Sequence, residues 1–387
     1  MSPMDFPNDR AHSVQISHTC HALAKLGVDV SLYVGRMTRP SVAACMDFYR
    51  LDVPEAMSVS SIGNWQWLTR LKKLDRFLFN TRFKRICGKA RGQDDVFVYT
   101  RGARGVELLR GLPRGPGRPR LIVEAHKLLF VDARDRSKPP RKVRQIRELE
   151  ARVFARVDGI ASISDGVAQE IMQEFAPTCP IRVVRSGMVI RPPQPPGTAK
   201  DIDMIYCGQL RPWKGVDTLI RAMQWLPDHR LTMIGGHNAE DLARVRGLAA
   251  DLEVAGRITF LGYVPWKRVW DYLHRAKVGI IPTPGGFSAV ADRYTSPMKL
   301  FEYMICGMPV VGSDLPSIRE VLKDGVTGKL VPPNDPRALA EAALSLLNDG
   351  QLLRRMGAQA RRYAEEYSWE KRARRIIELL DCVKERG

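Results

Sequence analysis

The sequence lacks long apolar runs and paired cysteines. No apolar stretch approaches the ~18 residues that a membrane-spanning helix needs, and no signal peptide is visible at the start. The seven cysteines are scattered, odd in number, and form no C-x-x-C pair. These absences exclude a spanning helix, a disulfide framework and a cysteine-based zinc site. We therefore expect a globular protein of a reducing compartment, the cytoplasm.

Acidic residues are scarce relative to basic ones. Asp and Glu number 42 against 61 Lys and Arg, which gives a net charge of +19. Such an excess favours a polyanionic partner, namely nucleic acid, an anionic membrane surface or a charged substrate. The sequence contains no helix-turn-helix, zinc finger or aromatic-studded RNA-binding strand, so we expect no nucleic-acid partner. A chain of 387 residues is long enough for two domains, each with its own core.

One stretch, Tyr294–Asp314, combines a helix, a turn and a buried strand. Thr295-Ser296-Pro297 predicts the helix start, because a hydroxyl can cap the first free N–H groups and Pro is tolerated at the first helical position. Apolar residues then recur at helical spacing over Met298–Ile305. Gly307 is expected to end the helix, and the strand to begin at Val310.

Basic residues lie at the start of this helix and in a second loop upstream. A helix N-terminus has free N–H groups and partial positive charge, so it attracts phosphate. Lys299 adds a full charge in that first turn, and Glu302 one turn later is within reach of a sugar hydroxyl. Upstream, the glycines of the loop Gly208–Gly215 allow close backbone approach, and Arg211 and Lys214 can meet a diphosphate. The pattern predicts a site for a phosphorylated ligand.

These two segments resemble a known family. Tyr294–Asp314 together with Tyr206–Ile220 is similar to the donor-binding half of family 4 of the retaining glycosyltransferases, and the likeness is strong from Asp201 onward. The resemblance implies an α/β protein of the GT-B fold, with two Rossmann-like domains facing each other across a cleft. We expect an acceptor-side domain over 1–190, a Pro-rich linker over 191–200, a donor-binding domain over 201–365, and a final segment, 366–387, whose helix crosses back to the first domain.

The resemblance also implies a set of site residues. The donor is a nucleotide-diphosphate sugar, the acceptor is a glycan or a lipid-linked sugar, and no metal or other cofactor is expected, because fixed cations neutralise the leaving diphosphate. The expected catalytic residues are His126, Lys214 and Arg211. The expected donor-binding residues are Gly208, Gln209, Tyr263, Val264, Tyr294, Ser296, Pro297, Met298, Lys299 and Glu302.

The first half of the chain contributes cleft residues, and the second half departs twice from the family pattern. His126 follows a strand end, where open α/β sheets bind ligands, and is expected beside the sugar without acting as a general base. Arg10 and His12 open the first helix, predicted to be capped near residues 8 and 9, and are expected on the acceptor side. Gln209 stands where the family has Arg, so whether Arg211 supplies that charge stays open. Tyr294 stands where the family has Glu, so the identity of the sugar stays open.

The segment Trp65–Arg91 carries nine Lys or Arg residues and one acid, Asp75. Trp67, Leu71, Leu74 and Leu78 form an apolar stripe at helical spacing. A basic amphipathic helix of this kind is typical of an element that lies in a membrane interface. The alternative is a helix packed on its own domain with a solvated basic face. The first interpretation predicts a peripheral protein on the inner face of the membrane.

A Rossmann-like domain opens with a buried central strand, and this sequence has little room for one. Only Met1-Ser-Pro-Met-Asp5 precedes the first loop, and five residues with Pro at the third are too few for a strand of ~5–6 residues. We therefore expect the native protein to begin upstream of Met1. Asp201 and Asp203 form a D-x-D, but it precedes a strand, so we interpret it as coincidence rather than as a metal motif.

Taken with the resemblance, the sequence predicts a hexosyltransferase of cell-envelope polysaccharide or glycolipid biosynthesis. Two alternatives on the same fold stay open because of Gln209 and Tyr294, a nucleotide-sugar epimerase and a non-catalytic nucleotide-sugar-binding protein. A nucleic-acid binder, suggested by charge alone, is disfavoured.

Overall fold

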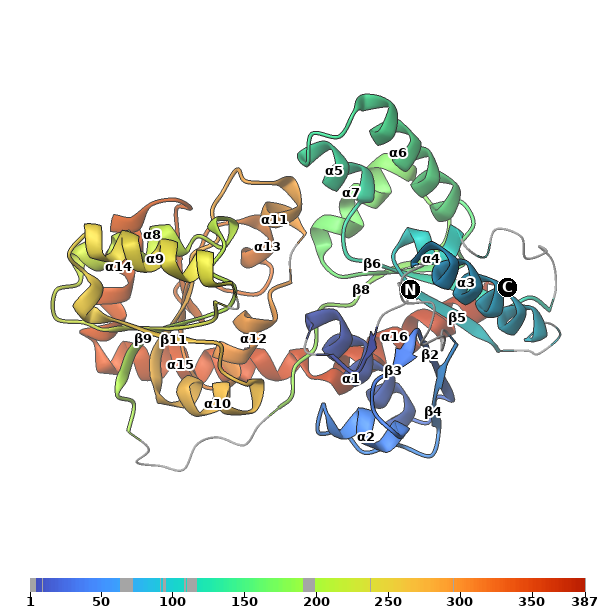
Figure 1. Ribbon diagram of the computed structural model, residues 1–387, viewed down its shortest axis with the longest axis horizontal. Helices are drawn as coiled ribbons and strands as arrows, with labels where there is room; N and C mark the ends of the chain where they lie inside the picture. The colour runs from blue at the N-terminus through green and yellow to red at the C-terminus, as the bar shows by residue number, and fades with distance from the viewer. Residues whose placement is uncertain are drawn as a thin grey trace. The chain divides into compact units, whose positions relative to one another are not determined.

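The computed structural model of the chain contains two compact units, Met1–Gly187 with Trp369–Gly387, and Met188–Ser368 (Figure 1). The structure describes residues 5–8, 10–62, 72–90, 92, 95–107, 109, 117–190, 199–236, 238–294 and 296–386. Residues 191–198 of the linker expected over 191–200, and the apolar residues Trp67 and Leu71, lie outside these ranges. Each unit is built on parallel strands covered by helices, as the α/β prediction requires.

The first unit contains a four-stranded parallel sheet and two smaller strand pairs. Its sheet has the order β5 (Phe97–Arg101), β6 (Arg120–Ala125), β7 (Gly159–Ser162) and β8 (Ile181–Val183). β2 (Val30–Val34) pairs with β4 (Met57–Ser61), and β1 (Asp5–Phe6) pairs with β3 (Arg36–Met37), all in parallel. Within the described ranges, no strand joins the β2–β4 pair to β5.

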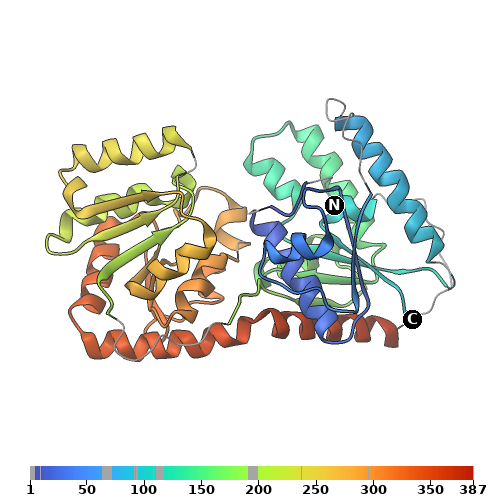
Figure 2. The same ribbon diagram turned by 60° about the horizontal axis from the view of Figure 1, so that its bottom comes forward.

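Eight helices surround these strands in the described part of the first unit. They are α1 (Ala11–Lys25), α2 (Val42–Asp47), α3 (Lys72–Lys89), α4 (Ala103–Glu107), α5 (Leu129–Asp135), α6 (Pro140–Phe154), α7 (Asp165–Phe175) and α16 (Trp369–Glu385). The last of them, α16, lies along α1 and against β7 and β8 (Figure 2). Its Ile376, Leu379 and Val383 share one core with Ile122 of β6, so the C-terminal helix is an integral part of this unit.

The second unit contains one six-stranded parallel sheet. Its order is β11 (Ile258–Gly262), β10 (Leu231–Ile234), β9 (Ile202–Cys207), β12 (Ala276–Ile281), β13 (Val310–Ser313) and β14 (Gly328–Val331). The helices are α8 (Val216–Ala222), α9 (Ala239–Asp251), α10 (Trp266–Arg275), α11 (Ala289–Arg293), α12 (Met298–Ile305), α13 (Pro316–Arg319), α14 (Pro336–Leu347) and α15 (Gly350–Ala364). Two apolar clusters form the core, one containing residues of α8 and α14 and the other residues of α10, α12 and α15.

Two predicted helix starts are wrong in detail. α1 begins at Ala11, its N-cap residue Arg10 has no side-chain cap, and Asn8 Oδ1 accepts from the Arg10 amide instead. α12 begins at Met298, and Pro297 occupies the N-cap position, where its side chain has no oxygen to offer. The hydroxyl cap predicted at 295–296 does not form at Ser296, because that residue lies one position outside the cap. The predicted end at Gly307 is confirmed, with a φ of 64°.

The described part of α3 packs on the first unit. Phe79 is buried, and its ring stacks on that of Phe83 with 6.3 Å between the ring centroids. The Phe83 ring also meets the Tyr33 ring of β2 edge-on, again with 6.3 Å between the centroids. Arg82 Nη1 donates to the Ile62 carbonyl at 3.0 Å. From residue 79 onward this helix therefore agrees with the packed alternative. The stripe that suggested a membrane surface precedes it.

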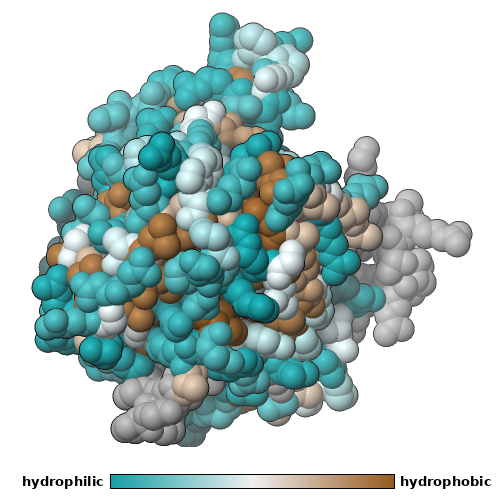
Figure 3. Space-filling model, turned by 90° about the vertical axis from the view of Figure 1, so that its left-hand side faces the viewer, coloured by the Kyte–Doolittle hydropathy of each residue, from teal (hydrophilic) through white to brown (hydrophobic). Residues whose placement is uncertain are grey.

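Hydrophilic residues predominate on the face of the molecule shown in Figure 3, with apolar residues in small patches between them. Among the described helices, none is both long and apolar enough to cross a membrane.

Candidate functional site

The strand order of the second unit creates a topological switch point. The chain runs outward from β9 to β10 and β11, and then returns to place β12 on the other side of β9. Ligands of open parallel sheets bind at such a point, beyond the carboxyl ends of the strands. Two loops begin there, Gly208–Gly215 after β9 and the loop over 282–288 after β12. The first is the basic loop singled out from the sequence.

Glycines allow backbones to meet at this point. A Cβ at Gly215, which has a φ of 72°, would lie 1.5 Å from the Pro282 carbonyl oxygen. A Cβ at Gly235 would lie 1.7 Å from the Gly208 carbonyl oxygen. No side chain fits at either position, so the loops after β9, β10 and β12 approach one another with their backbones. Peptide N–H groups in such loops are able to approach a phosphate closely.

Lys214 and Lys299 supply positive charge beside these loops. Lys299 Nζ lies 4.1 Å from the centroid of the Tyr206 ring, and a Cβ on Gly208 would lie 3.6 Å from the same nitrogen. Burial, and then the charge of Lys214, lowers the pKa of Lys299 to about 7. Burial also lowers the pKa of Lys214. Among the residues that the structure describes, no carboxylate forms an ion pair with either lysine, although the charge of Glu302 acts to raise the pKa of Lys299.

Lys299 is the second residue of α12, so it lies in the first turn of that helix. Met298 is its first residue, and the Leu300 amide already donates to the Pro297 carbonyl at 3.0 Å. Ser296 Oγ is buried, and within the described part of the chain it has no hydrogen-bond partner. A buried hydroxyl without a partner is costly, which suits a position that a ligand oxygen completes.

Arg211 is occupied by another contact. Its Nε lies 3.0 Å from Asp241 Oδ2, and its guanidinium lies 5.5 Å from the Trp213 ring centroid. Gln209, at the position where the family has Arg, is exposed, and its carbonyl accepts from Tyr206 Oη at 2.7 Å. The structure therefore brings Lys214 and Lys299 together, while Arg211 is bound to an acid. Its contact with diphosphate stays a prediction.

The remaining donor-side residues differ in exposure. Tyr263 is 52% exposed beyond β11, and Val264 follows it half-buried. Tyr294 is only 1% exposed, with the Arg293 guanidinium 5.5 Å from its ring centroid, so it is a packing residue in this structure. Glu302 is half-buried on α12, and burial, followed by the charge of Glu302, raises the pKa of Cys207 at the end of β9.

The first unit contains a second cluster of polar residues at the carboxyl ends of β5 and β6. His126 Nε2 lies 2.5 Å from Glu124 Oε1, and His126 Nδ1 lies 3.2 Å from Arg101 Nη2. Burial is the main cause that lowers the pKa of His126. Arg372 of α16 pairs with the same Glu124 oxygen at 2.9 Å. His126 is thus part of a network, not an isolated side chain.

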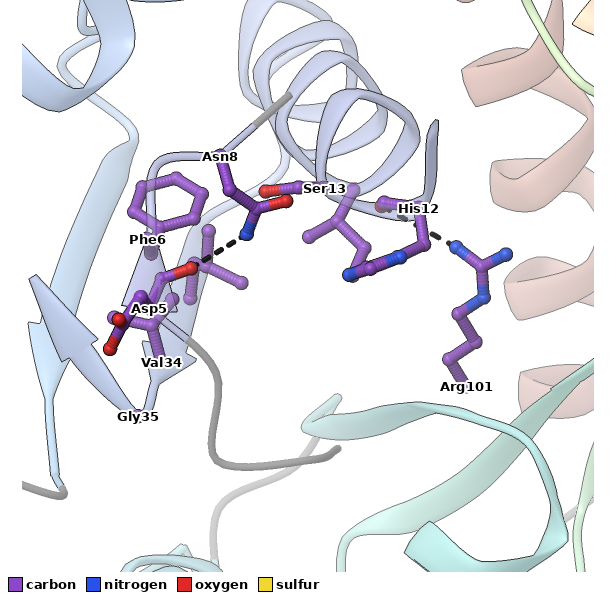
Figure 4. Close-up of a pocket in the computed structure, with 10 residues that line it drawn as sticks. Asp5, Phe6, Asn8, His12, Ser13, Val34, Gly35 and Arg101 are labelled. Carbon is purple, nitrogen blue, oxygen red and sulfur yellow. Dashed lines mark hydrogen bonds between the residues drawn. The ribbon is translucent and has the colours of Figure 1, made fainter. Parts of the chain in front are cut away.

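A cavity of about 210 Å³ lies beside this network, and His12 and Arg101 are among its lining residues (Figure 4). Arg101 Nη1 donates to the His12 carbonyl at 3.4 Å. Within the described residues, the buried His12 Nε2 has no partner, and burial followed by Arg101 lowers the pKa of His12. Arg10 is exposed at the start of α1.

Sequence reasoning missed Arg101, Glu124 and Arg372 as members of a site. Strand alternation offered a signal for Glu124, because it lies two residues before His126 and side chains two apart in a strand share a face. Arg101 ends the neighbouring strand, in register with Glu124. Arg372 had no local signal, because it reaches this cluster from the other end of the chain.

The described residues contain no group of His, Cys, Asp or Glu able to hold a metal ion. The D-x-D residues are in ion pairs, Asp201 with Arg275, and Asp203 with Lys277 at 2.7 Å.

Comparison with known proteins assigns the family. A family model described as glycosyl transferases group 1 matches residues 192–363, and one described as a glycosyl transferase 4-like domain matches residues 11–187. The D-inositol 3-phosphate glycosyltransferase of Thermobispora bispora is 28% identical over 195 residues, which cover 47% of this chain and 44% of the relative. The phosphatidyl-myo-inositol mannosyltransferase of Mycolicibacterium smegmatis is 31% identical over 180 residues, covering 46% and 44%. The matches therefore span about half the length of these relatives.

Solved structures agree over nearly the whole chain. A sucrose-phosphate synthase from Thermosynechococcus elongatus superposes with a TM-score of 0.76 at 19% identity, covering 98% of this chain and 94% of that one. Anabaena HepE in complex with UDP-glucose gives a TM-score of 0.69 at 14% identity, covering 97% and 98%. These likenesses confirm the fold predicted from the two motifs. The chain has the GT-B fold with two Rossmann-like domains and belongs to the glycosyl transferases group 1 family.

Proposed function

We propose that the protein transfers a sugar from a nucleotide-diphosphate sugar to an acceptor, with retention of configuration at the anomeric carbon. One observation carries the proposal. Lys214 and Lys299 lie at the switch point of the second unit, beside loops whose glycines allow close backbone approach, and neither is in an ion pair within the described residues. A site with two lysines outside any ion pair and accessible peptide N–H groups suits a diphosphate, whose charge favours the protonated form of both lysines.

The chemistry follows from that charge. As the sugar–phosphate bond breaks, negative charge grows on the departing diphosphate and positive charge on the sugar ring. Preorganised donors aimed at the growing negative charge are usually the largest catalytic term. Lys214, Lys299 and the N-terminus of α12 are the donors, and the Ser296 hydroxyl adds one more. Glu302 accepts from the ribose hydroxyls and sets the position of the nucleotide, while the loop at Tyr263 and Val264 holds the base.

Two relatives bear on the acceptor. One is named for an inositol phosphate acceptor and the other for phosphatidyl-myo-inositol. Both names describe acceptors with a phosphate group, in one case on a lipid. A phosphate-bearing or lipid-linked acceptor agrees with the net charge of +19. A role in envelope polysaccharide or glycolipid synthesis, at the inner face of the membrane, follows as part of the same proposal.

A second function on this fold has a specific observation in its favour. Tyr294 is buried where the family has a sugar-binding glutamate, and Arg211 is paired with Asp241. A protein that binds a nucleotide sugar without transferring it, or an epimerase, tolerates these differences at the sugar end of the donor site. Both alternatives keep the diphosphate site and lose the transfer step.

A panel of UDP-, GDP- and ADP-sugars separates these functions. Each donor is incubated with sugar phosphates or with vesicles that contain lipid-linked acceptors, and both nucleotide release and product are measured. Transfer to an acceptor with retained configuration, seen in the proton NMR coupling of the new glycoside, supports the proposal. A nucleotide sugar with altered stereochemistry indicates an epimerase, and binding without turnover indicates a binding protein. Lys214→Ala should lower turnover strongly, while Lys329→Ala, which removes a lysine from the edge strand β14, should not.

A further inference from the structure

Glu124 is a buried carboxylate with partners from other elements of the first unit. Its oxygens accept hydrogen bonds from Tyr99 Oη at 2.6 Å and from His126 Nε2 at 2.5 Å, and Arg372 Nη2 lies 2.9 Å away. Burial acts to raise the pKa of Glu124, but Arg372, His126 and Arg101 outweigh it and hold that pKa well below its ordinary value. Glu124 is therefore a fixed negative charge in the interior.

The guanidinium of Arg372 is held on three sides. It is 1% exposed, its Nε donates to Thr19 Oγ1 at 3.0 Å, and its Nη1 donates to the carbonyls of Val184 at 2.6 Å and Arg185 at 2.7 Å. These partners belong to α1 and to the segment after β8. The planar guanidinium has little freedom once these bonds are made. The C-terminal helix thus places a charge of defined position against Glu124.

The contacts of His126 determine its tautomer. A guanidinium only donates, so His126 Nδ1 must accept from Arg101 Nη2, which lies 3.2 Å away. His126 Nε2 must then carry the proton and donate it to Glu124. Burial, Arg101 and Arg372 favour the neutral ring, against the opposite effect of Glu124. Both ring nitrogens are occupied, so His126 has no lone pair left for proton abstraction.

Arg101 is the member of this network that faces the cavity. Figure 4 shows its guanidinium next to His12 at the edge of the pocket. It donates to the His12 carbonyl and to His126, and within the described part of the first unit no carboxylate forms an ion pair with it. Glu124 balances one of the two guanidinium groups, Arg372 or Arg101. With His126 neutral, the cluster therefore keeps one positive charge.

We propose that Arg101 is an acceptor-binding residue that takes an anionic group, a phosphate or carboxylate, and that Glu124 and Arg372 are positioning residues that hold it through His126. Glu124 is held in place, and its hydrogen bond to His126 holds the imidazole ring in one orientation. The lone pair on His126 Nδ1 then accepts from one N–H of Arg101. The other N–H groups of the planar guanidinium remain to bind an oxyanion. The C-terminal helix acts on the acceptor site through this chain of contacts. The inference rests on the proposed transfer function.

The kinetic test compares acceptor and donor parameters. Arg101→Met should raise the acceptor KM about 10- to 100-fold, the scale for loss of one charged hydrogen bond, and leave the donor KM unchanged. Arg372→Lys should shift the acceptor KM in the same direction by less. Because removal of one buried charge can unfold the protein, the double variant Glu124→Gln/Arg372→Met, which removes both, is the second test. Arg374→Met on the same helix, an exposed residue paired with Glu370 at 2.8 Å, is the matched control and should change neither KM.

A spectroscopic test does not depend on turnover. In ¹⁵N-histidine NMR, His126 should appear as the neutral Nε2–H tautomer at pH 7, and Arg372→Lys should disturb that signal while Arg374→Met does not. Inorganic phosphate, compared with chloride at equal ionic strength, should shift the Arg101 side-chain signal. A His126 that is protonated at pH 7, or that carries its proton on Nδ1, would overturn the positioning role. An acceptor KM that is unchanged in a folded Arg101→Met protein would overturn the binding role.

An absence of transfer from every donor would overturn the proposed function instead. The NMR test of Arg101 and His126 would still apply in that case, because it does not require turnover.

Discussion

Each unit places basic side chains at the carboxyl ends of parallel strands, but only the first places a carboxylate among them that balances part of the charge. In the first unit, Glu124 bonds to His126, pairs with Arg372 and offsets one of the two guanidinium groups of Arg372 and Arg101. In the second unit, Lys214 and Lys299 lie near each other, and no carboxylate pairs with them within the described ranges. A carboxylate within the cluster fixes the geometry of the basic groups around it, and in the first unit it leaves one positive charge for an anionic acceptor. The two lysines of the second unit have no such carboxylate, which suits the more highly charged diphosphate.

The largest effect should come from breaking the Glu124–Arg372 pair of the first unit. Arg372→Met leaves Glu124 charged and buried without its main partner, so we expect a loss of about 3–5 kcal/mol in the free energy of unfolding. Urea unfolding followed by circular dichroism measures it, with Arg374→Met as the control. A midpoint shared by both variants would show that the Glu124–Arg372 pair contributes no more than an exposed one.

In the second unit, Lys214→Ala should reduce kcat about 10²- to 10³-fold, because the charge of Lys214 matters most as the diphosphate departs. This corresponds to a loss of ~2.7–4 kcal/mol in transition-state stabilisation. The fold should be retained, since removal of one of two like charges relieves repulsion. Steady-state kinetics with the active donor gives the measurement. Turnover at the level of Lys329→Ala would remove Lys214 from the site.

A pH experiment tests whether the lysine pair is uncompensated. The pKa of Lys299 is about 7 in the folded protein against an ordinary value of 10.5. Between these values the unfolded state binds a proton that the folded state lacks, so stability should rise with pH across this range. A diphosphate restores the charge, so at pH 8 binding of a nucleoside diphosphate should take up about one proton. Calorimetry in buffers of different ionisation enthalpy measures the uptake, and Lys299→Arg, permanently charged, should abolish it.

The smallest effect concerns a third group of unbalanced charge, the segment Trp65–Arg91. If its stripe lies on a membrane, the protein should sediment with anionic vesicles and dissociate as salt rises. Trp67→Ser with Leu71→Gln should release it without loss of fold. Phe79→Ser is not a fair control, because Phe79 is buried in the first unit. Sedimentation that persists in the double variant would assign the binding to another surface.

Much of the second unit was predictable because its signals are local. The structure places three features as expected because each depends on residues close in sequence. They are the helix ended by Gly307, the strand from Val310 and the basic loop Gly208–Gly215. The hydroxyl cap predicted at Ser296 was wrong because the helix begins one residue later than predicted, which leaves Pro297 at the cap position. Arg211 and Asp241 are about thirty residues apart, with α8 and β10 between them, so no local sequence pattern predicts that they pair.

The sequence by itself determined the α/β class, the phosphate-seeking chemistry of two loops and the family, because glycine positions, helix periodicity and lysine placement express backbone requirements that act over a few residues. Only the tertiary structure decided which charges are compensated. Glu124 and Arg372 are 248 residues apart and meet because α16 packs on the first unit, and Arg101 and Glu124 meet because β5 and β6 are neighbours in register. Charge compensation depends on distances between side chains of remote elements, and packing of the whole domain sets those distances.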